Sequence, residues 1–459
     1  MLFRSTNNGS VNAIASGANT LSGAITGTGS LVQLGSGTTT LSGTNSVATL
    51  FARFGTALIS GSTTATNFAS IGQLSGDSGI LTVQSGGSLT VNTGAGDLNV
   101  GDLAGSTGTL NTAGTVAATN LYVGKNNDNL TSAATGTVSQ SGGTVTVSGA
   151  NGVILALNQN AAGTYNLDGG TLTTQKISKG GGATGTFNFN GGTLKATAAS
   201  ATFMTGLTTA NVRNGGAIFD TNSNNITVGQ ALIHSTIGGD NATDGGLTKN
   251  SAGTLTLTAA STYTGATTVN GGTLAVSGSL SATTAVNINA GTLLLGANNL
   301  VNDAAAVSLG GGTLATGGFS DTLGALTLTA NSTIDFGAGS ASELTFTTLT
   351  LGSNSLNIWN WTATNLPAET DGGGAGDGLR DRLLFTTLGS LSAAELSQIH
   401  FFSDAGSTAL GSQAGQISFG GNQELVPVPE PTTIFGALAL LGLVGYRERR
   451  RLGALLRRA

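Results

Sequence analysis

Cysteine is absent from this chain of 459 residues, and histidine occurs only twice, as His234 and His400. Without thiols the protein has no disulfide framework, no thiolate metal site and no cysteine nucleophile, although export remains compatible with this lack. Two histidines leave little material for a histidine-based triad or a multi-histidine metal site. We therefore expect both to be core or surface residues, and we predict no cofactor.

Charged and aromatic side chains are also scarce, at 8% and 5% of the chain. This composition is unlike that of an enzyme, yet it contains too much valine, leucine and isoleucine for a disordered chain. Six of the sixteen basic residues lie in the last thirteen positions, and the others form no basic stripe. Nucleic-acid binding is therefore not expected.

Glycine, in contrast, is abundant, with 75 residues. Together with many Thr, Ser, Asn, Val and Leu residues, it favours short strands joined by tight turns and almost no helix. A unit recurs in which alternating apolar and polar residues meet Gly-Gly-Thr-Leu or a close variant. Copies occur at Gly86–Leu89, Gly108–Leu110, Gly142–Val145, Tyr165–Leu172, Phe187–Leu194, Val286–Leu293 and Val307–Leu314.

Neighbouring copies are commonly about twenty residues apart, the length of one coil of two or three short strands with their turns. The alternation sends Val, Leu, Phe or Ile inward and Thr, Ser or Asn outward, while glycines form the corners. We predict an all-β fold, with a right-handed parallel β-helix over residues 1–338. Stacked Asn and Thr side chains either form hydrogen-bonded ladders between coils or merely suit turns and solvated strand faces, and both interpretations stay open.

One segment permits a closer comparison with a known repeat. Residues 246–274 contain a Gly-Leu-Thr-Lys opening at Gly246–Lys249, a Gly-Thr-Leu strand at Gly253–Leu255, a Tyr-Thr-Gly turn at Tyr263–Gly265 and a closing Gly-Gly-Thr-Leu at Gly271–Leu274. This pattern resembles the autotransporter-associated β-strand repeat. The resemblance, which extends loosely over residues 80–340, implies a surface-exposed, passenger-like β-helix.

The pattern changes after Phe336, and residues 339–426 are predicted to form a separate C-terminal β module. Strands are expected within 344–351, 356–361 and 382–385, where apolar residues alternate or cluster. Ser392 and Glu395 have the spacing of a capping box, which predicts a short helix to Ile399. Strand character resumes at His400.

The end of the chain combines a rigid spacer, an apolar stretch and a basic cluster. Glu424–Pro431 is expected to be extended because each proline disfavours helix in the residue before it. Thr432–Tyr446 is uncharged and apolar, and we predict a transmembrane helix there. Fifteen helical residues span about 22 Å, short of the roughly 30 Å hydrocarbon core, so this segment is marginal as a permanent span. The arginines after it would stay cytoplasmic, with everything before the helix exported.

This order of elements resembles the PEP-CTERM sorting signal. Pro429, Glu430 and Pro431 fit its triplet, residues 432–446 fit its membrane segment, and its basic cluster is matched by Arg447, Arg449, Arg450 and Arg451. The resemblance implies an exosortase-like sorting protease as partner, transient anchoring in the inner membrane of a Gram-negative bacterium, and final placement on the outer surface or in the extracellular matrix. A simple hydrophobic anchor without processing is the alternative. Because Met1–Asn8 lacks the apolar core of a secretory signal, we expect the natural start to lie upstream.

Catalytic chemistry is the least supported part of the sequence. A β-helix polysaccharide lyase or hydrolase needs clustered carboxylates on one face together with Lys or Arg. The acids are instead spaced singly, mostly beside glycines, as is typical of turns: Asp97, Asp102, Asp128, Asp168, Asp220, Asp240 and Asp244. Residues 369–381 faintly resemble a calcium-binding Gly-Asp repeat in the wrong register, so a loop is predicted, with weak Ca²⁺ binding by Asp371 and Asp377 as the remaining hypothesis.

We therefore expect an exported structural or adhesive protein and not an enzyme. Its mechanism would be the presentation of a long, hydroxyl-rich and weakly acidic surface to exopolysaccharide or to other cells. The alternative is a β-helix polysaccharide lyase or hydrolase anchored at the cell surface. Three regions are predicted: repeats over residues 1–338, the β module over 339–426 and the sorting signal over 427–459.

Overall fold

The computed structural model describes residues 5–6, 9–92, 96–128, 130–337, 341–362, 380–411 and 413–428. Within them the chain is almost wholly β-structure, and a single four-residue helix, α1 (Ala393–Leu396), accompanies the strands. The predicted all-β fold with a long parallel sheet, as a β-helix has, is confirmed. The chain forms two compact units, Met1–Leu294 with Leu300–Ala305 and Leu295–Asn299 with Ala306–Ala459.

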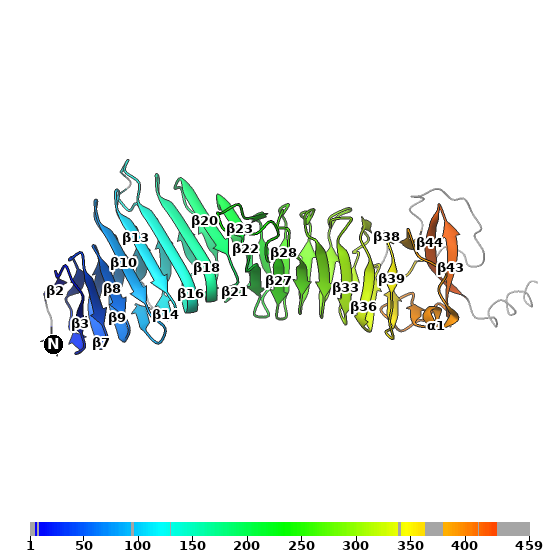
Figure 1. The fold of residues 1–459 in the computed structure, drawn as a ribbon, viewed down its shortest axis with the longest axis horizontal. Coiled ribbons are helices and arrows are strands. Elements are labelled where there is room, and N and C mark those ends of the chain that lie inside the picture. Colours follow the sequence, from blue (N-terminus) through cyan, green and yellow to red (C-terminus); the bar gives the residue numbers. More distant parts are fainter. Residues whose placement is uncertain are drawn as a thin grey trace, which may run out of the picture. The chain divides into compact units, whose positions relative to one another are not determined.

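In the first unit, successive strands turn from one of three parallel ladders to the next, so the coils lie side by side (Figure 1). We call these ladders faces A, B and C. Face A contains β2 (Ser10–Ala13), β5 (Ser30–Gln33), the ends of β7 (Thr44–Ala52) and β9 (Ser62–Ile71), β12 (Asp97–Val100), β15 (Asn120–Val123), β17 (Val153–Leu155), β19 (Ile177–Lys179), β22 (Ser200–Thr205), β25 (Ile226–Val228), β28 (Thr254–Leu257) and β30 (Thr273–Val276).

The other two faces are built in the same way. Face B contains β3 (Asn19–Leu21), β6 (Thr38–Leu41), β8 (Thr56–Ile59), β10 (Ser78–Val83), β13 (Thr107–Thr112), the starts of β16 (Thr135–Val147) and β18 (Ala162–Thr174), β20 (Thr184–Phe189), β23 (Thr209–Val212) and β26 (Leu232–His234). Face C contains β1 (Ser5–Thr6), β4 (Ile25–Thr26), the starts of β7 and β9, β11 (Ser88–Val91), β14 (Thr115–Ala118), the ends of β16 and β18, β21 (Thr193–Ala196), β24 (Ala217–Asp220), β27 (Leu247–Asn250), β29 (Thr267–Val269) and β31 (Ala285–Ile288). The strand β32 (Thr292–Leu295) lies where the two units meet in sequence.

The repeated motif does not keep one position of the coil. In face C the copies that end at Leu89, Val145, Leu172 and Leu194 stack in register, with Val116 between the first two, and all five residues are buried. The copy at Gly108–Leu110 lies instead on β13 of face B, and the copy that ends at Leu274 lies on β30 of face A. Coil length varies more than the motif suggested. Thr38 pairs with Thr56, an advance of 18 residues, whereas Ser78 pairs with Thr107, an advance of 29.

Aliphatic and aromatic columns fill the interior because alternate residues of each strand point inward. In the middle of the unit the rings form a chain, with centroids 5.2 Å apart for Tyr165 and Phe187, 4.6 Å for Phe187 and Phe189, and 5.3 Å for Phe189 and Phe219. The Tyr165 hydroxyl donates to Gln140 Oε1 over 2.6 Å, so its polar end is satisfied inside the core. Such stacking gives successive coils a continuous apolar interior.

Hydrogen-bonded ladders of amide side chains connect neighbouring coils. On face B, Asn188 Nδ2 donates to Asn166 Oδ1 and Asn211 Nδ2 donates to Asn188 Oδ1, each over 2.7 Å. A second ladder joins Asn289, Asn270 and Asn250, with two bonds of 2.9 Å. At these positions the ladder interpretation is confirmed.

The second unit contains three further parallel ladders. They comprise β33 (Ala306–Gly310), β36 (Leu326–Ala330) and β39 (Leu349–Thr350); β34 (Thr313–Ala315), β37 (Ser332–Asp335), β40 (Leu356–Trp359) and β42 (Ile399–Phe401); and β35 (Asp321–Thr322), β38 (Glu343–Phe346) and β41 (Arg382–Phe385). The last ladder continues with the antiparallel strands β44 (Asn422–Val428) and β43 (Gln413–Phe419). Parallel pairing therefore runs across residue 338, where the β module was predicted to begin.

The predicted capping box is confirmed, because Ser392 Oγ accepts from the Glu395 N–H and the Glu395 carboxylate accepts from the Ser392 N–H. The helix ends at Leu396, since β42 begins at Ile399, three residues later. No helix among the described residues is long and apolar enough to cross a membrane. The transmembrane segment predicted over residues 432–446 lies outside the described residues.

Candidate functional site

The residues predicted to form the sorting signal lie outside the described residues, as do the two aspartates of the calcium hypothesis. These are Pro429, Glu430, Pro431, Arg447, Arg449, Arg450 and Arg451, with Asp371 and Asp377. All of them stay predictions. Within the described ranges, no group of three or more His, Cys, Asp or Glu side chains could hold a metal ion.

Two aspartates predicted to lie singly in turns share a lysine. Lys125 Nζ lies 3.7 Å from Asp97 Oδ2 and 3.9 Å from Asp102 Oδ1. The prediction of isolated acids is therefore wrong for this pair. Parallel stacking brings the three side chains together because β12 and β15 are neighbours on face A, with Asp97 paired to Asn120.

These charges line a groove of about 390 Å³ beside β9 and β12, which we call the face A groove. Its lining combines amides, two carboxylates, one ammonium and one aromatic ring: Asn67, Phe68, Gln73, Asp97, Asn99, Asp102, Leu103, Lys125 and Asn127. Amides and carboxylates together can both donate and accept hydrogen bonds. The groove thus differs in chemistry from the threonine-rich strand faces around it.

Glycine corners set the geometry of this groove. Gly101, after β12, has a φ of +73°, and a Cβ there would lie 2.3 Å from the Thr135 carbonyl oxygen. Gly72 after β9 and Gly124 after β15 share the positive φ and have backbone neighbours equally close. Only glycine tolerates both conditions, so three successive coils turn at the same point.

The residue after each of these glycines therefore occupies equivalent positions in three coils. The Asp102 N–H donates to the Gly72 carbonyl over 2.9 Å, and the Lys125 N–H donates to the Gly101 carbonyl over 2.7 Å. Gln73, Asp102 and Lys125 are thereby placed in one column. An amide, a carboxylate and an ammonium follow one another along the corner of the solenoid.

Asp102 is the most buried charge of the groove, at 7% exposure. Its Oδ2 accepts from Ser70 Oγ over 3.0 Å and from Asn99 Nδ2 over 3.5 Å, while its Oδ1 has no hydrogen bond and lies near Lys125. Burial raises the pKa of the Asp102 carboxyl, although the Lys125 charge and the Ser70 hydroxyl act against this rise. The contacts of the Asp102 carboxylate therefore do not fully offset the cost of burying its charge.

Asn99 is the second incompletely satisfied group. It lies between the inward Leu98 and Val100, so its side chain points to the groove side of β12, yet it is only 3% exposed. Its Oδ1 makes no hydrogen bond. A buried amide oxygen without a donor costs about 1–3 kcal/mol, and such a group in a native protein calls for an explanation.

His234 belongs to a separate polar cluster at the end of β26. Its Nδ1 lies 2.9 Å from Asp244 Oδ2 and 3.3 Å from Thr264 Oγ1, so both partners compete for the same nitrogen. Asp244 also accepts backbone N–H bonds of 2.8–2.9 Å from Gly246, Thr264 and Gly265. Although burial acts in the other direction, these bonds hold the pKa of Asp244 below its usual range. The cluster connects a turn to the next coil by hydrogen bonds. It is not arranged as a catalytic triad, because Asp244 and Thr264 lie at the same ring nitrogen and not at opposite ones.

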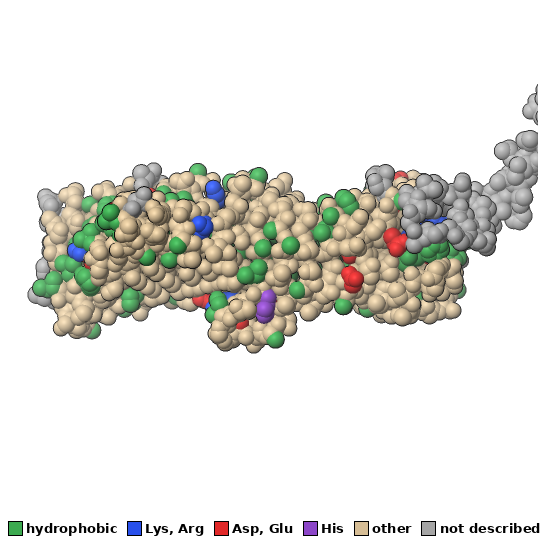
Figure 2. All heavy atoms as spheres, turned by 90° about the horizontal axis from the view of Figure 1, so that it is seen from above, with side chains coloured by type: hydrophobic (Ala, Val, Ile, Leu, Met, Phe, Trp, Pro, Cys, Tyr) green, Lys and Arg blue, Asp and Glu red, His purple; other side chains and the backbone are tan. Residues whose placement is uncertain are grey.

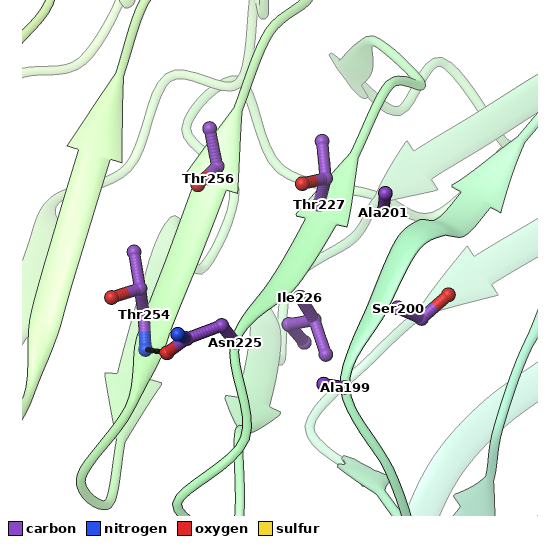
Figure 3. A pocket seen from close by; sticks show the side chains of 8 residues that line it. All are labelled: Ala199, Ser200, Ala201, Asn225, Ile226, Thr227, Thr254 and Thr256. Atoms are coloured by element: carbon purple, nitrogen blue, oxygen red, sulfur yellow. Dashed lines mark hydrogen bonds between the residues drawn. The ribbon is translucent and has the colours of Figure 1, made fainter.

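A second groove, of about 440 Å³, lies over β22, β25 and β28 (Figure 3). Figure 3 shows Thr227, Thr254 and Thr256 projecting from neighbouring strands, and Asn225 Oδ1 accepting from the Thr254 N–H over 2.9 Å. Ala199, Ser200, Ala201 and Ile226 complete the lining, so this groove carries no charge. Figure 2 likewise shows few and scattered charged side chains on the face in view.

Comparison with known proteins identifies the repeats. Residues 31–66 and 247–276 match the family profile described as passenger-associated-transport-repeat. These two segments are similar to passenger repeats. Such repeats imply an exported, surface-displayed protein of the autotransporter passenger type. No curated protein and no solved structure matches the chain. The segment predicted at 246–274 is confirmed, whereas the one at 31–66 was missed.

The two passenger repeats share a buried side chain that caps a glycine turn. Lys249 is fully buried, and its ammonium donates to the carbonyls of Asn250, Ser251 and Gly271 over 2.7–3.0 Å. Gln33, equally spaced from the following Gly-Thr, is also buried and donates to the carbonyls of Gly35 and Gly37. Because residues 30–33 are Ser-Leu-Val-Gln, the Gly-Leu-Thr-Lys pattern did not detect residues 31–66.

Proposed function

We propose that this chain is an exported structural or adhesive protein of the bacterial surface or extracellular matrix, and that it has no enzymatic activity. The observation that carries the proposal is the parallel solenoid that contains two passenger-type repeats. A solenoid presents long, regular faces for contact and buries its own apolar residues between coils. Adhesion requires no more than such a surface held outside the cell.

The proposal includes a right-handed coil and sorting by the C-terminal residues. Right-handed coiling follows from the general preference of parallel strand crossovers, about 98% of which are right-handed. Sorting is supported by the order of Pro429–Pro431, residues 432–446 and Arg447–Arg451, with an exosortase-like protease as partner and a transient inner-membrane anchor. Exopolysaccharide or other cells are the proposed contacts of the displayed solenoid.

Mass spectrometry of the protein recovered from the cell surface tests the sorting step. In a host with an exosortase, the mature chain is expected to lack the residues from Arg447 to Ala459. Deletion of the exosortase should leave them in place and keep the protein in the inner membrane. An exported chain that retains Arg447–Ala459 in the exosortase-bearing host would contradict the sorting proposal.

A surface-anchored polysaccharide lyase or hydrolase remains the second candidate, and one observation favours it. Asp97 and Asp102 flank Lys125 on a single solenoid face, which is the kind of cluster such an enzyme needs. Incubation with polysaccharides, followed by assays for new reducing ends and unsaturated sugars, separates the two functions. Adhesion predicts no product, whereas product formation abolished in D97N would favour the enzyme.

A further inference from the structure

We propose that the face A groove is a binding site for a neutral glycan, with Asp97, Asn99 and Lys125 among its recognition groups. This inference rests on the proposed adhesive function and specifies the ligand class and the place of contact. The groove alone combines charge, amide groups and a cavity among the described pockets of the first unit. The third pocket, beside Thr82 and Asn111, has no charged lining.

Hydrogen-bonding capacity points to a sugar. Asn67, Gln73 and Asn127 offer amides that are exposed or partly exposed, and each amide both donates and accepts. Adjacent sugar hydroxyls likewise donate and accept, so a carboxylate beside an ammonium can engage a hydroxyl pair. Asp97 and Lys125 provide that combination, since they are partly exposed and 3.7 Å apart.

One wall of the groove supplies apolar contact. Phe68 is partly exposed and lines the groove, while its ring packs edge-on against Phe51 with centroids 5.5 Å apart. This packing holds the ring in place, and a fixed aromatic ring is suited to the C–H face of a pyranose. An open groove with one such ring and several hydrogen-bonding groups fits a segment of a longer polymer.

Two buried atoms without hydrogen bonds are the independent sign of a binding role. Asn99 Oδ1 and Asp102 Oδ1 are both shielded from solvent and without hydrogen bonds, and both side chains line the groove. The neighbouring coil has the smaller Ser70 at the position paired with Asn99, and the Ser70 hydroxyl is hydrogen-bonded to Asp102. Retention of two costly groups at one spot is consistent with their use in ligand recognition.

The local charge selects against an acidic polymer. Asp97 and Asp102 face the single ammonium of Lys125, and the Asp128 carboxylate adds to the negative field at Asp102. Like charges in such proximity disfavour uronate or sulfate groups. The glycan bound here is therefore uncharged.

Affinity gel electrophoresis of the full-length protein tests the proposal, with laminarin, dextran and galactomannan as neutral probes and polygalacturonate and alginate as acidic ones. At least one neutral probe should retard the wild type more than either acidic probe. D97A should bind that probe about tenfold more weakly and N67A several-fold more weakly. D220A is the matched control and should bind as the wild type does. Asp220 does not line the groove, and its Oδ2 lies 3.5 Å from Lys195 Nζ.

Three results would overturn the glycan site: no retardation by any neutral probe, stronger binding of the acidic probes, or equal binding by N67A, D97A and D220A. Circular dichroism checks that each variant is folded, and N67A changes an exposed side chain. Shortening of a bound probe would show that the protein cleaves the glycan, which would contradict a site that only binds. Failure here leaves surface display intact, because display is measured separately by labelling whole cells.

Discussion

At the residue scale, the solenoid depends on side chains that satisfy the carbonyl groups of its glycine turns. Lys249 and Lys179 direct their ammonium groups to turn carbonyls, and Gln33 does the same with its amide. A tight turn leaves carbonyl groups that no neighbouring strand can pair with. A long polar side chain from the preceding strand therefore donates hydrogen bonds to them. The inward lysine of the passenger repeat is thus a structural residue.

Lys249 gives the protein a pH-dependent stability. Burial lowers the pKa of its ammonium to about 8 from an ordinary value of 10.5. The unfolded chain then binds more protons than the folded chain between these values, so the free energy of unfolding should rise as the pH increases from about 8 to 10.5. The rise is at most about 1.4 kcal/mol for each pH unit. Chemical denaturation across this range should show it in the wild type and not in K249M.

K195M provides the control for this measurement, because Lys195 is partly exposed and pairs with Asp220 at the surface. It should retain the rise seen in the wild type. A K249M variant whose free energy of unfolding follows the wild-type pH profile would contradict the buried ammonium.

Glycine at the groove corner is a second residue-level requirement. In G101A the new Cβ would meet the Thr135 carbonyl oxygen at 2.3 Å and the residue would keep a positive φ, so a loss of about 2 kcal/mol or more is expected. G238A is the control, since a Cβ at Gly238 meets no atom within 4 Å. Urea unfolding that gave both variants the same stability would refute the steric argument.

At the element scale, side-chain ladders fasten one strand to the next. Asn188 occupies the middle of the face B ladder, where it donates to Asn166 and accepts from Asn211. N188A should lose about 1–2 kcal/mol of unfolding free energy, because both neighbours are left with an unused group. N12A, at an exposed position of β2, should change stability by less than about 0.5 kcal/mol. Equal effects would mean that the ladder contributes nothing.

Strands were predicted well where the alternation of side chains was regular. The copies that end at Val145, Leu172 and Leu194 stack on face C because inward residues must meet inward residues in neighbouring coils. The Ser392–Glu395 capping box was equally readable, since it depends on four consecutive residues. Coil length was less readable because corners such as Leu74–Asp77 extend a coil without changing its strands.

The groove escaped prediction because it depends on register between coils. Asp97 and Lys125 are 28 positions apart, and only the pairing of β12 with β15 brings them together. A usable signal was present in the recurrence of Ile-Gly-Gln at 71–73, Val-Gly-Asp at 100–102 and Val-Gly-Lys at 123–125. Alignment of these triplets in the sequence is enough to place Gln73, Asp102 and Lys125 in one column.

At the scale of the whole molecule, two properties belong together: a stacked solenoid and its display outside the cell. Each coil of the first unit buries its apolar residues against the next, and polar side chains cover the strand faces. Display of such a surface requires export, which the passenger-type repeats imply. Both properties can be measured in one experiment because the chain has no cysteine of its own.

Single cysteines at Thr184, which is exposed on β20, and at Ala210, which is fully buried on β23, provide the test. Intact cells that express each variant are treated with a membrane-impermeant maleimide, with and without urea. We predict that T184C is labelled on intact cells without urea and that A210C is labelled only after unfolding. Protection of T184C until the cells are lysed, or equal labelling of both positions without urea, would contradict a displayed solenoid.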